Sequence, residues 1–185
     1  MQHKFLFLTL FVLISLIIPQ GCGYHFRETG KPIGVQIQSL AIPLMESTSS
    51  SLGFEGVFTR MIREEFVSHA RVPIVSRDEA ATVLIGRVSE IKTEPYTYRV
   101  DRNTVGGRKT TYEVTNARWL RVKLDARLVE RPSGKIIWAE RGMEERTTFS
   151  VGTDPLENRY NQDQALRRIA RSLAERIYLK TMERF

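Results

Sequence analysis

The sequence is poor in the residue types that bind transition metals. It contains one cysteine, Cys22, and three histidines, His3, His25 and His69. A single thiol cannot form an intrachain disulfide or a cysteine-based zinc site, and only three imidazoles remain as alternative ligands. The sequence therefore predicts no metal site and no cofactor, and it argues against a metalloenzyme.

Local signatures of catalysis are missing as well. The chain contains no G-x-S-x-G, Walker, G-x-G-x-x-G or H-E-x-x-H motif. The doublets Glu64/Glu65 and Glu144/Glu145 could supply a general acid and base, but their positions opposite an apolar helix stripe and in a strongly charged strand are typical of solvated faces. We predict that the protein is not an enzyme. A hydrolase whose site assembles only on folding is the alternative, and a pocket with perturbed pKa values would support it.

Length and composition indicate an ordinary globular protein with a basic surface. The chain has 185 residues, enough for one ordinary domain, with 42% apolar and 26% charged residues and no low-complexity bias. Collagen-like, coiled-coil and wholly disordered chains are thereby excluded. The net charge of +7 at pH 7 predicts attraction to anions, whether nucleic acid, anionic lipid head groups or acidic proteins.

The N-terminus has the layout of an export signal. An apolar run from Phe5 to Ile18 follows a single lysine and leads to Cys22. As a helix the run would span roughly 21 Å, short of the ~30 Å needed to cross a bilayer. The only cysteine, standing directly after this run, is similar to the acylated cysteine of bacterial lipoproteins. Pro19 and Gln20 depart from the usual lipobox pattern.

These features divide the chain into three parts. We predict a lipoprotein signal peptide over residues 1–21, a lipidated tether over 22–34 and a single α/β domain over 35–185. Gly23 follows the cysteine where an aspartate would resemble an inner-membrane retention signal. We therefore expect a lipid anchor in the outer membrane, on its periplasmic side.

Hydrophobic periodicity predicts an α+β fold. Helical spacing runs from Phe54 to His69 and again from Asn161 to the C-terminus, with Asp154 and Pro155 able to open the second helix earlier. Strands are predicted over 35–44, 82–100 with a bulge or break at Pro95, 120–128 and 135–149. We expect the two amphipathic helices to pack on one face of a mixed or antiparallel sheet of about four strands.

The basic excess is concentrated between residues 99 and 135, a segment that contains ten lysines and arginines but only four acidic residues. Part of it lies in a predicted hairpin turn over 101–109, which contains two glycines followed by Arg108 and Lys109. Tyr96, Tyr98, Tyr112 and Trp119 lie nearby. This combination fits a site for a large amphipathic anion or a protein partner. A solvated sheet face with ordinary salt pairs is the alternative. Nucleic acid would also fit the charge, but the expected periplasmic location argues against it, so we expect no nucleic-acid partner.

Several short motifs together resemble one known family. The start Cys-Gly-Tyr-His-Phe at 22–26 is similar to the C-G-[FY]-H-[FL] start of the lipopolysaccharide-assembly lipoprotein family LptE. The Gly-Arg-Lys hairpin tip, the Pro-Ser-Gly-Lys turn at 132–135 and the Asp-Pro-Leu at 154–156 are also similar to features of that family. The resemblance covers the mature chain in the order of its elements.

The resemblance implies a role without catalysis. It implies an outer-membrane lipoprotein that plugs the LptD β-barrel and helps lipopolysaccharide reach the outer leaflet. Lys109 matches the family's basic hairpin position, its neighbour Arg108 joins it, and Arg102 belongs to the same site if the hairpin closes as predicted. The implied fold, two helices against a four-stranded sheet, agrees with the periodicity. A periplasmic scaffolding or regulatory lipoprotein that binds a cell-wall synthase or secretion-system component through its sheet edge is the alternative.

Overall fold

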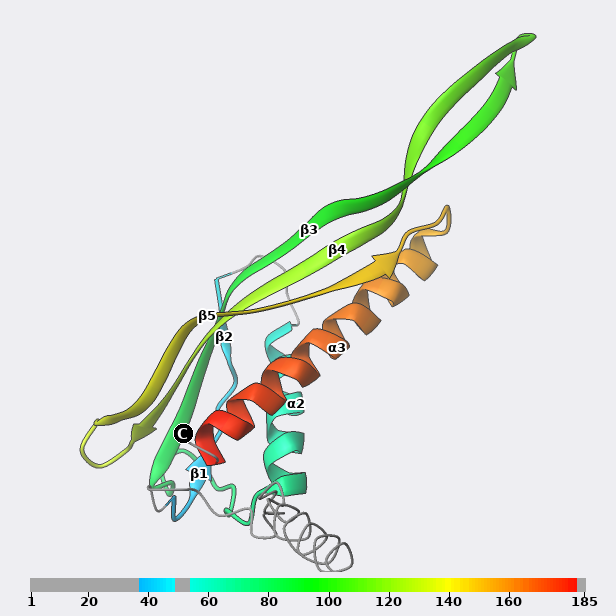
Figure 1. Ribbon diagram of the computed structural model, residues 1–185. Coiled ribbons are helices and arrows are strands. Elements are labelled where there is room, and N and C mark those ends of the chain that lie inside the picture. The colour runs from blue at the N-terminus through cyan, green and yellow to red at the C-terminus, as the bar shows by residue number, and fades with distance from the viewer. Residues whose placement is uncertain (1–36, 49–53, 183–185) are drawn as a thin grey trace, which may run out of the picture.

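A computed structural model describes residues 37–48 and 54–182 (Figure 1). Along the described chain lie β1 (Leu40–Ala41), β2 (Glu46–Ser47), α2 (Phe54–His69), β3 (Thr82–Val105), β4 (Arg108–Glu130), β5 (Ile136–Ser150) and α3 (Pro155–Met182). β1, β3, β4 and β5 follow one another across the sheet, and β2 also pairs with β3. The first two strands are parallel to β3 and the other pairs are antiparallel. The predicted α+β class is therefore confirmed, with five strands in a mixed sheet.

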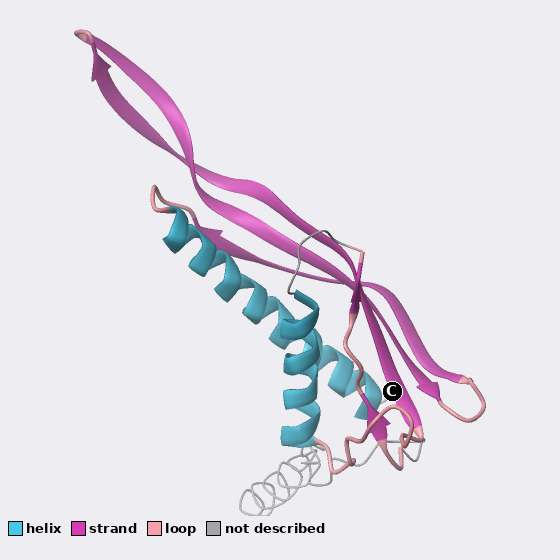
Figure 2. Cartoon of the chain, turned by 180° about the vertical axis from the view of Figure 1, so that it is seen from behind, coloured by secondary structure: helices cyan, strands magenta, loops and turns pink. Residues whose placement is uncertain are grey.

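Both helices lie on the same face of the sheet, as the view from behind shows (Figure 2). β4 supplies the sheet side of the core because, between Leu120 and Leu128, apolar even-numbered residues alternate with polar odd-numbered ones. Leu120, Val122, Leu124 and Leu128 are fully buried. The apolar stripes of the helices cover them, and the buried members of these stripes are Phe58, Ile62, Phe66, Leu166, Ile169, Leu173 and Ile177. The periodicities of β4 and of both helices therefore predict the core correctly.

The strand predicted over residues 35–44 is wrong in extent. Residues 35 and 36 lie outside the described residues, and the remainder pairs with β3 only at Leu40 and Ala41. The carbonyl oxygen of Ile42 instead accepts a hydrogen bond of 2.8 Å from Nε of Arg63 in α2. Pro43 then has no N–H to donate to a ladder. A side chain from a helix thus ends the strand, which the local apolar pattern could not predict.

The long helix α3 begins where the capping motif predicts. The backbone N–H of Leu156 donates to Oδ1 of Asp154 at 2.8 Å, so Asp154 is the N-cap of a helix that starts at Pro155. Its first turns are exposed, with Leu156 and Tyr160 facing solvent. The apolar stripe therefore locates only the buried part of the helix, from Ala165 onward.

Side chains of α3 cover the free edge of β5. Nδ2 of Asn161, Nη2 of Arg168 and Nη1 of Arg176 donate to the carbonyl oxygens of Ser150, Thr148 and Glu144, at 3.2, 3.0 and 2.9 Å. These acceptors belong to even-numbered residues of an edge strand. Because an uncovered edge is a template for pairing with another chain, these bonds make β5 a poor site for added strands.

No helix among residues 37–48 and 54–182 is long and apolar enough to cross a membrane.

Candidate functional site

Beyond the end of β5 the sheet narrows to a two-stranded ribbon. β5 ends at Ser150, which pairs with Ala117 of β4, whereas β3 and β4 continue together to Val105 and Arg108. We call residues 98–116 the arm; it is the projection at the upper right of Figure 1. Its eight residue pairs, from Tyr98–Thr115 to Val105–Arg108, correspond to a length of roughly 27 Å.

A bend at Pro95 separates the arm from the sheet. The register between β3 and β4 shifts between Pro95 and Thr97 and again between Thr97 and Tyr98. Such irregularities increase the local twist of a strand pair. The predicted break at Pro95 is therefore confirmed, and it marks the base of the arm.

Two glycines close the arm. Gly106 and Gly107 have φ angles of 58° and 77°, so both central residues of the two-residue turn lie in the left-handed region. This conformation suits the twist of a β-hairpin, and glycine adopts it without the penalty that a Cβ atom brings. The predicted hairpin is confirmed, but its turn is shorter than the predicted 101–109, and Arg102 lies within β3 opposite Thr111.

The arm has no core of its own. All its described side chains are at least partly exposed, including those of Tyr98, Val100 and Tyr112, at 55%, 57% and 45%. An isolated two-stranded ribbon is marginally stable in water. The ribbon therefore exposes apolar area that a ligand or a partner could cover.

The register places the three predicted site residues on different faces of the arm. Residues directly opposite each other in an antiparallel pair have their side chains on the same face, and successive residues alternate. One face, the Arg102 face, therefore bears Tyr98, Val100, Arg102, Lys109, Thr111, Glu113 and Thr115. The other, the Arg108 face, bears Arg99, Asp101, Arg108, Thr110, Tyr112 and Val114. Arg102 and Lys109 are brought together, and Arg108 is not.

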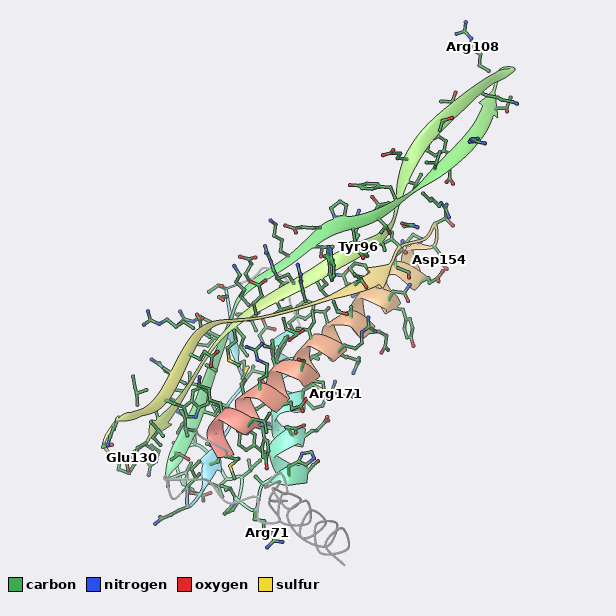
Figure 3. The ribbon with its side chains drawn as sticks, viewed as in Figure 1. Arg71, Tyr96, Arg108, Glu130, Asp154 and Arg171 are labelled. Atoms are coloured by element: carbon green, nitrogen blue, oxygen red, sulfur yellow. The ribbon has the colours of Figure 1, made fainter. Side chains whose placement is uncertain are left out.

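The three predicted cations are exposed and free of acidic partners. Arg102, Arg108 and Lys109 form no ion pair within the part of the chain that the structure describes, whereas Nε of Arg99 lies 3.2 Å from Asp101. Figure 3 shows Arg108 at the far end of the arm, pointing into solvent. The fourth predicted site residue, Cys22, lies outside the described residues.

Acidic side chains neutralise part of the remaining basic excess on the sheet. Arg121 lies 3.2 Å from Glu90, and Lys123 lies 3.5 Å from Glu90 and 3.8 Å from Glu144. The hydrogen bond from Lys92 and its charge, with a smaller contribution from Arg121, lower the pKa of the exposed Glu94 carboxyl below its usual range. On this part of β3, β4 and β5 the solvated-face interpretation holds, whereas the three cations of the arm have no ion pair among the described residues and lie beside exposed apolar side chains.

An aromatic pair lies at the base of the arm. The rings of Tyr96 and Trp119 have centroids 4.7 Å apart, and the guanidinium of Arg146 lies 4.8 Å from the centre of the Trp119 ring. Figure 3 places Tyr96 on the sheet near the point where the arm begins. Of the four aromatic residues singled out from the sequence, the fold brings together only these two. Arg146 was missed, because its place beside Trp119 depends on the pairing of β4 with β5.

The acidic doublets do not form a catalytic pair. Glu144 contacts Lys123 in the neighbouring strand β4, whereas Oε2 of Glu145 accepts a hydrogen bond from Ser172 of α3 at 3.0 Å. Arg60 approaches Glu64 to 3.9 Å across one helical turn. Residues 37–48 and 54–182 contain no cluster of three possible metal ligands. The arm is therefore the strongest candidate site, and its cations beside exposed apolar groups are suited to binding an amphipathic anion.

Comparisons with known proteins point to one family. The family model LptE, described as lipopolysaccharide-assembly, matches residues 37–181. A search of curated proteins finds no match.

Several solved structures are distant neighbours of the chain. A minor lipoprotein from Acinetobacter baumannii is 15% identical, with 80% of this chain and 93% of that one aligned and a TM-score of 0.47. The rare lipoprotein B from Shewanella oneidensis is 17% identical, with 75% and 90% aligned and a TM-score of 0.42. A hypothetical protein from Chlamydia trachomatis is 12% identical, with 77% and 96% aligned and a TM-score of 0.48.

Proposed function

The chain belongs to the LptE family of lipopolysaccharide-assembly proteins, and from this membership we propose a specific role. The protein is an outer-membrane lipoprotein, acylated at Cys22 after removal of residues 1–21. It is the plug and assembly partner of an LptD β-barrel, and it binds lipopolysaccharide through Arg102, Arg108 and Lys109 of the arm. The role is one of binding and assembly and includes no catalysis.

The observation that carries this proposal is the set of unpaired cations on the arm. Lipopolysaccharide presents clustered phosphates and carboxylates on an acylated glycolipid. Charge-assisted hydrogen bonds from lysine and arginine to such oxygens are among the stronger hydrogen bonds that proteins make, and arginine can bind them with two parallel bonds. Arg102, Arg108 and Lys109 have no competing carboxylate partner among the described residues.

The sheet face away from the helices suits the lumen of a barrel. The lumen of an outer-membrane barrel is lined by polar groups, so a plug needs a polar surface. Arg121, Lys123, Glu90, Glu94 and Glu144 supply one, with charges of both signs. The alternative role, scaffolding through the sheet edge, is less well supported, because side chains of α3 already cover the edge of β5.

The described chain enters the fold at the end of the sheet opposite the arm tip. Leu40 and Ala41 pair with Thr82 and Val83 at the start of β3, whereas the tip follows Val105 at its end. The 24 residues of β3 correspond to a contour of about 80 Å. The cations at the tip therefore lie far from β1.

Charge reversal on the arm tests lipopolysaccharide binding. We expect Arg102→Glu/Arg108→Glu/Lys109→Glu to weaken binding of purified lipopolysaccharide by at least about tenfold, because each lost charge-assisted bond contributes 1.5–3 kcal/mol. Thermal unfolding should change little, since the three side chains are exposed. The matched control reverses three exposed arginines of α3, Arg159, Arg167 and Arg171. Equal weakening by both triple variants, or none by either, would reject the arm as the binding site.

Partner identity is tested by affinity purification from solubilised outer membranes. We expect the full-length protein to retain a β-barrel protein in stoichiometric amount, identified by mass spectrometry, and to carry acyl chains on residue 22. Cys22→Ala should abolish acylation and reduce recovery of the protein in outer-membrane fractions, because two or more acyl chains provide stable anchoring. Retention of a soluble or inner-membrane enzyme in place of a barrel would favour the scaffolding role.

A further inference from the structure

The two faces of the arm carry different sets of charged and apolar residues, and neighbours in the sequence lie on opposite faces. Arg108 and Lys109 are neighbours in the chain, carry the same charge and are both exposed. The register nevertheless places Lys109 opposite Thr104 on the Arg102 face and Arg108 opposite Val105 on the other. We propose that the Arg102 face alone binds the amphipathic phosphorylated lipid, with Arg102 and Lys109 holding its phosphates and Tyr98 and Val100 contacting its acyl chains. This inference rests on the proposed function and narrows its site, because it leaves out Arg108, which lies on the other face.

The cations of the Arg102 face form a pair that one head group can bridge. Arg102 is directly opposite Thr111, so Lys109 is its diagonal neighbour on the same face, at a typical separation of about 7–8 Å. Neither side chain has an ion-pair partner in the described chain. On the Arg108 face, by contrast, Asp101 already pairs with Arg99 at 3.2 Å, which leaves Arg108 as a single unpaired cation.

Apolar groups continue the same face toward the sheet. Tyr98, Val100 and Arg102 are alternate residues of β3, so their side chains follow one another at intervals of roughly 7 Å. Tyr98 and Val100 are more than half exposed, at 55% and 57%. On the Arg108 face Tyr112 is exposed and Val114 is partly exposed, and the direct opposite of Tyr112 is the carboxylate-bearing Asp101. The Arg102 face thus joins two apolar side chains that are more than half exposed to two cations without an ion pair among the described residues.

The acid on this face sets the orientation of the ligand. Glu113 is directly opposite Val100, one step from Arg102 toward the sheet, and has no ion-pair partner among the described residues. Its charge repels phosphate from the sheet side of Arg102 and leaves the tip side, where Lys109 lies, as the favourable position. The head group thus lies toward Gly106 and Gly107, and the acyl chains lie toward the aromatic pair at the base of the arm.

Single charge reversals at adjacent residues test the assignment of the face. With the full-length protein and purified lipopolysaccharide in detergent, we expect Lys109→Glu to weaken binding about tenfold and Arg108→Glu to weaken it less than about twofold. The two variants change the net charge equally, so a general electrostatic effect would weaken lipopolysaccharide binding by the same factor in both. Equal weakening would overturn the face assignment while leaving lipopolysaccharide binding by the arm intact. If neither single variant nor the triple variant weakens binding, the proposed function itself fails at this site.

A second measurement tests the apolar strip. Tyr98→Ser/Val100→Ser is expected to weaken binding of acylated lipopolysaccharide about tenfold, and to leave binding of the fully deacylated phosphorylated saccharide within about twofold of the wild type. Tyr112→Ser is the matched change on the other face and should alter neither. Equal losses with both ligands would refute acyl contact. Phosphatidylglycerol vesicles are the third ligand tested. If the protein binds these vesicles as tightly as lipopolysaccharide, the ligand is an ordinary anionic lipid surface.

Discussion

At the scale of single residues, a close contact between β3 and the segment before α2 constrains the fold. A Cβ atom added to Gly86 would lie 2.4 Å from Cε and 2.7 Å from Sδ of Met45. Met45 is almost fully buried and its backbone N–H donates to Oγ1 of Thr59 at 2.9 Å. The methionine is therefore held at both its backbone and its side chain, and Gly86 leaves the space that its thioether occupies.

We expect Gly86→Ala to destabilise the protein by about 1–3 kcal/mol, because the buried thioether has to move into a packed core. In a Met45→Ala background the same substitution should cost much less, since the clashing atoms are gone. Urea unfolding of the four proteins of this double-mutant cycle measures the coupling. Gly56→Ala serves as a control, because a Cβ atom there meets nothing within 4 Å. The same cost for Gly86→Ala in both backgrounds would show that the contact is not the cause.

At the scale of elements, α3 owes its length to its capped N-terminal end as much as to its apolar stripe. The buried residues occupy the part of the helix from Ala165 onward, and the first ten residues are held by Asp154 and by the bond from Asn161 to β5. Asn158 adds to this start, since its side chain exchanges hydrogen bonds of 2.7 and 3.0 Å with the backbone of Gly152. These polar side-chain hydrogen bonds thus extend the helix beyond the part that packs on the sheet.

Asp154→Ala should lower the free energy of unfolding by about 1 kcal/mol, since the substitution removes an N-cap acceptor. Asp163→Ala, which removes an exposed carboxylate from the middle of the same helix, should have a much smaller effect. Urea titration followed by circular dichroism measures both changes. An effect of Asp163→Ala as large as that of Asp154→Ala would point to net charge in place of capping.

At the scale of the whole molecule, the protein consists of a packed layer of helices against a sheet and an arm that extends from it (Figure 1). Every buried residue of the core lies outside the arm. The arm adds exposed ribbon without adding buried core residues, so it contributes little to stability through burial. The ionic network on β3, β4 and β5 lies between the arm and the base of the sheet and keeps the intervening surface polar.

Shortening the arm should therefore separate stability from binding. Deletion of residues 99–104 together with 109–114 removes six opposed pairs and retains the glycine turn and the register. The midpoint of thermal unfolding should stay within a few degrees of the wild-type value, because no buried side chain is lost. Lipopolysaccharide binding should fall at least about tenfold, as both cations of the Arg102 face are gone. A large fall in thermal stability would mean that the arm supports the core.

The sequence by itself determined the elements whose residues repeat with a clear period. The alternation of Leu120 to Leu128 and the helical spacing from Phe54 to His69 predict both the element and its buried face, because burial on one side imposes that period. Turn chemistry likewise predicts the hairpin at Gly106 and Gly107.

Only the tertiary structure decided which residues meet across strands. The end of β1 depends on a guanidinium from α2, the position of Arg146 over Trp119 depends on the pairing of β4 with β5, and the separation of Arg108 from Lys109 depends on the register of the arm. In a strand the side chains alternate between faces, so a shift of one residue moves each of them to the other side. The sequence could therefore place the cations in the hairpin, but the backbone pairing was needed to show which of them share a face.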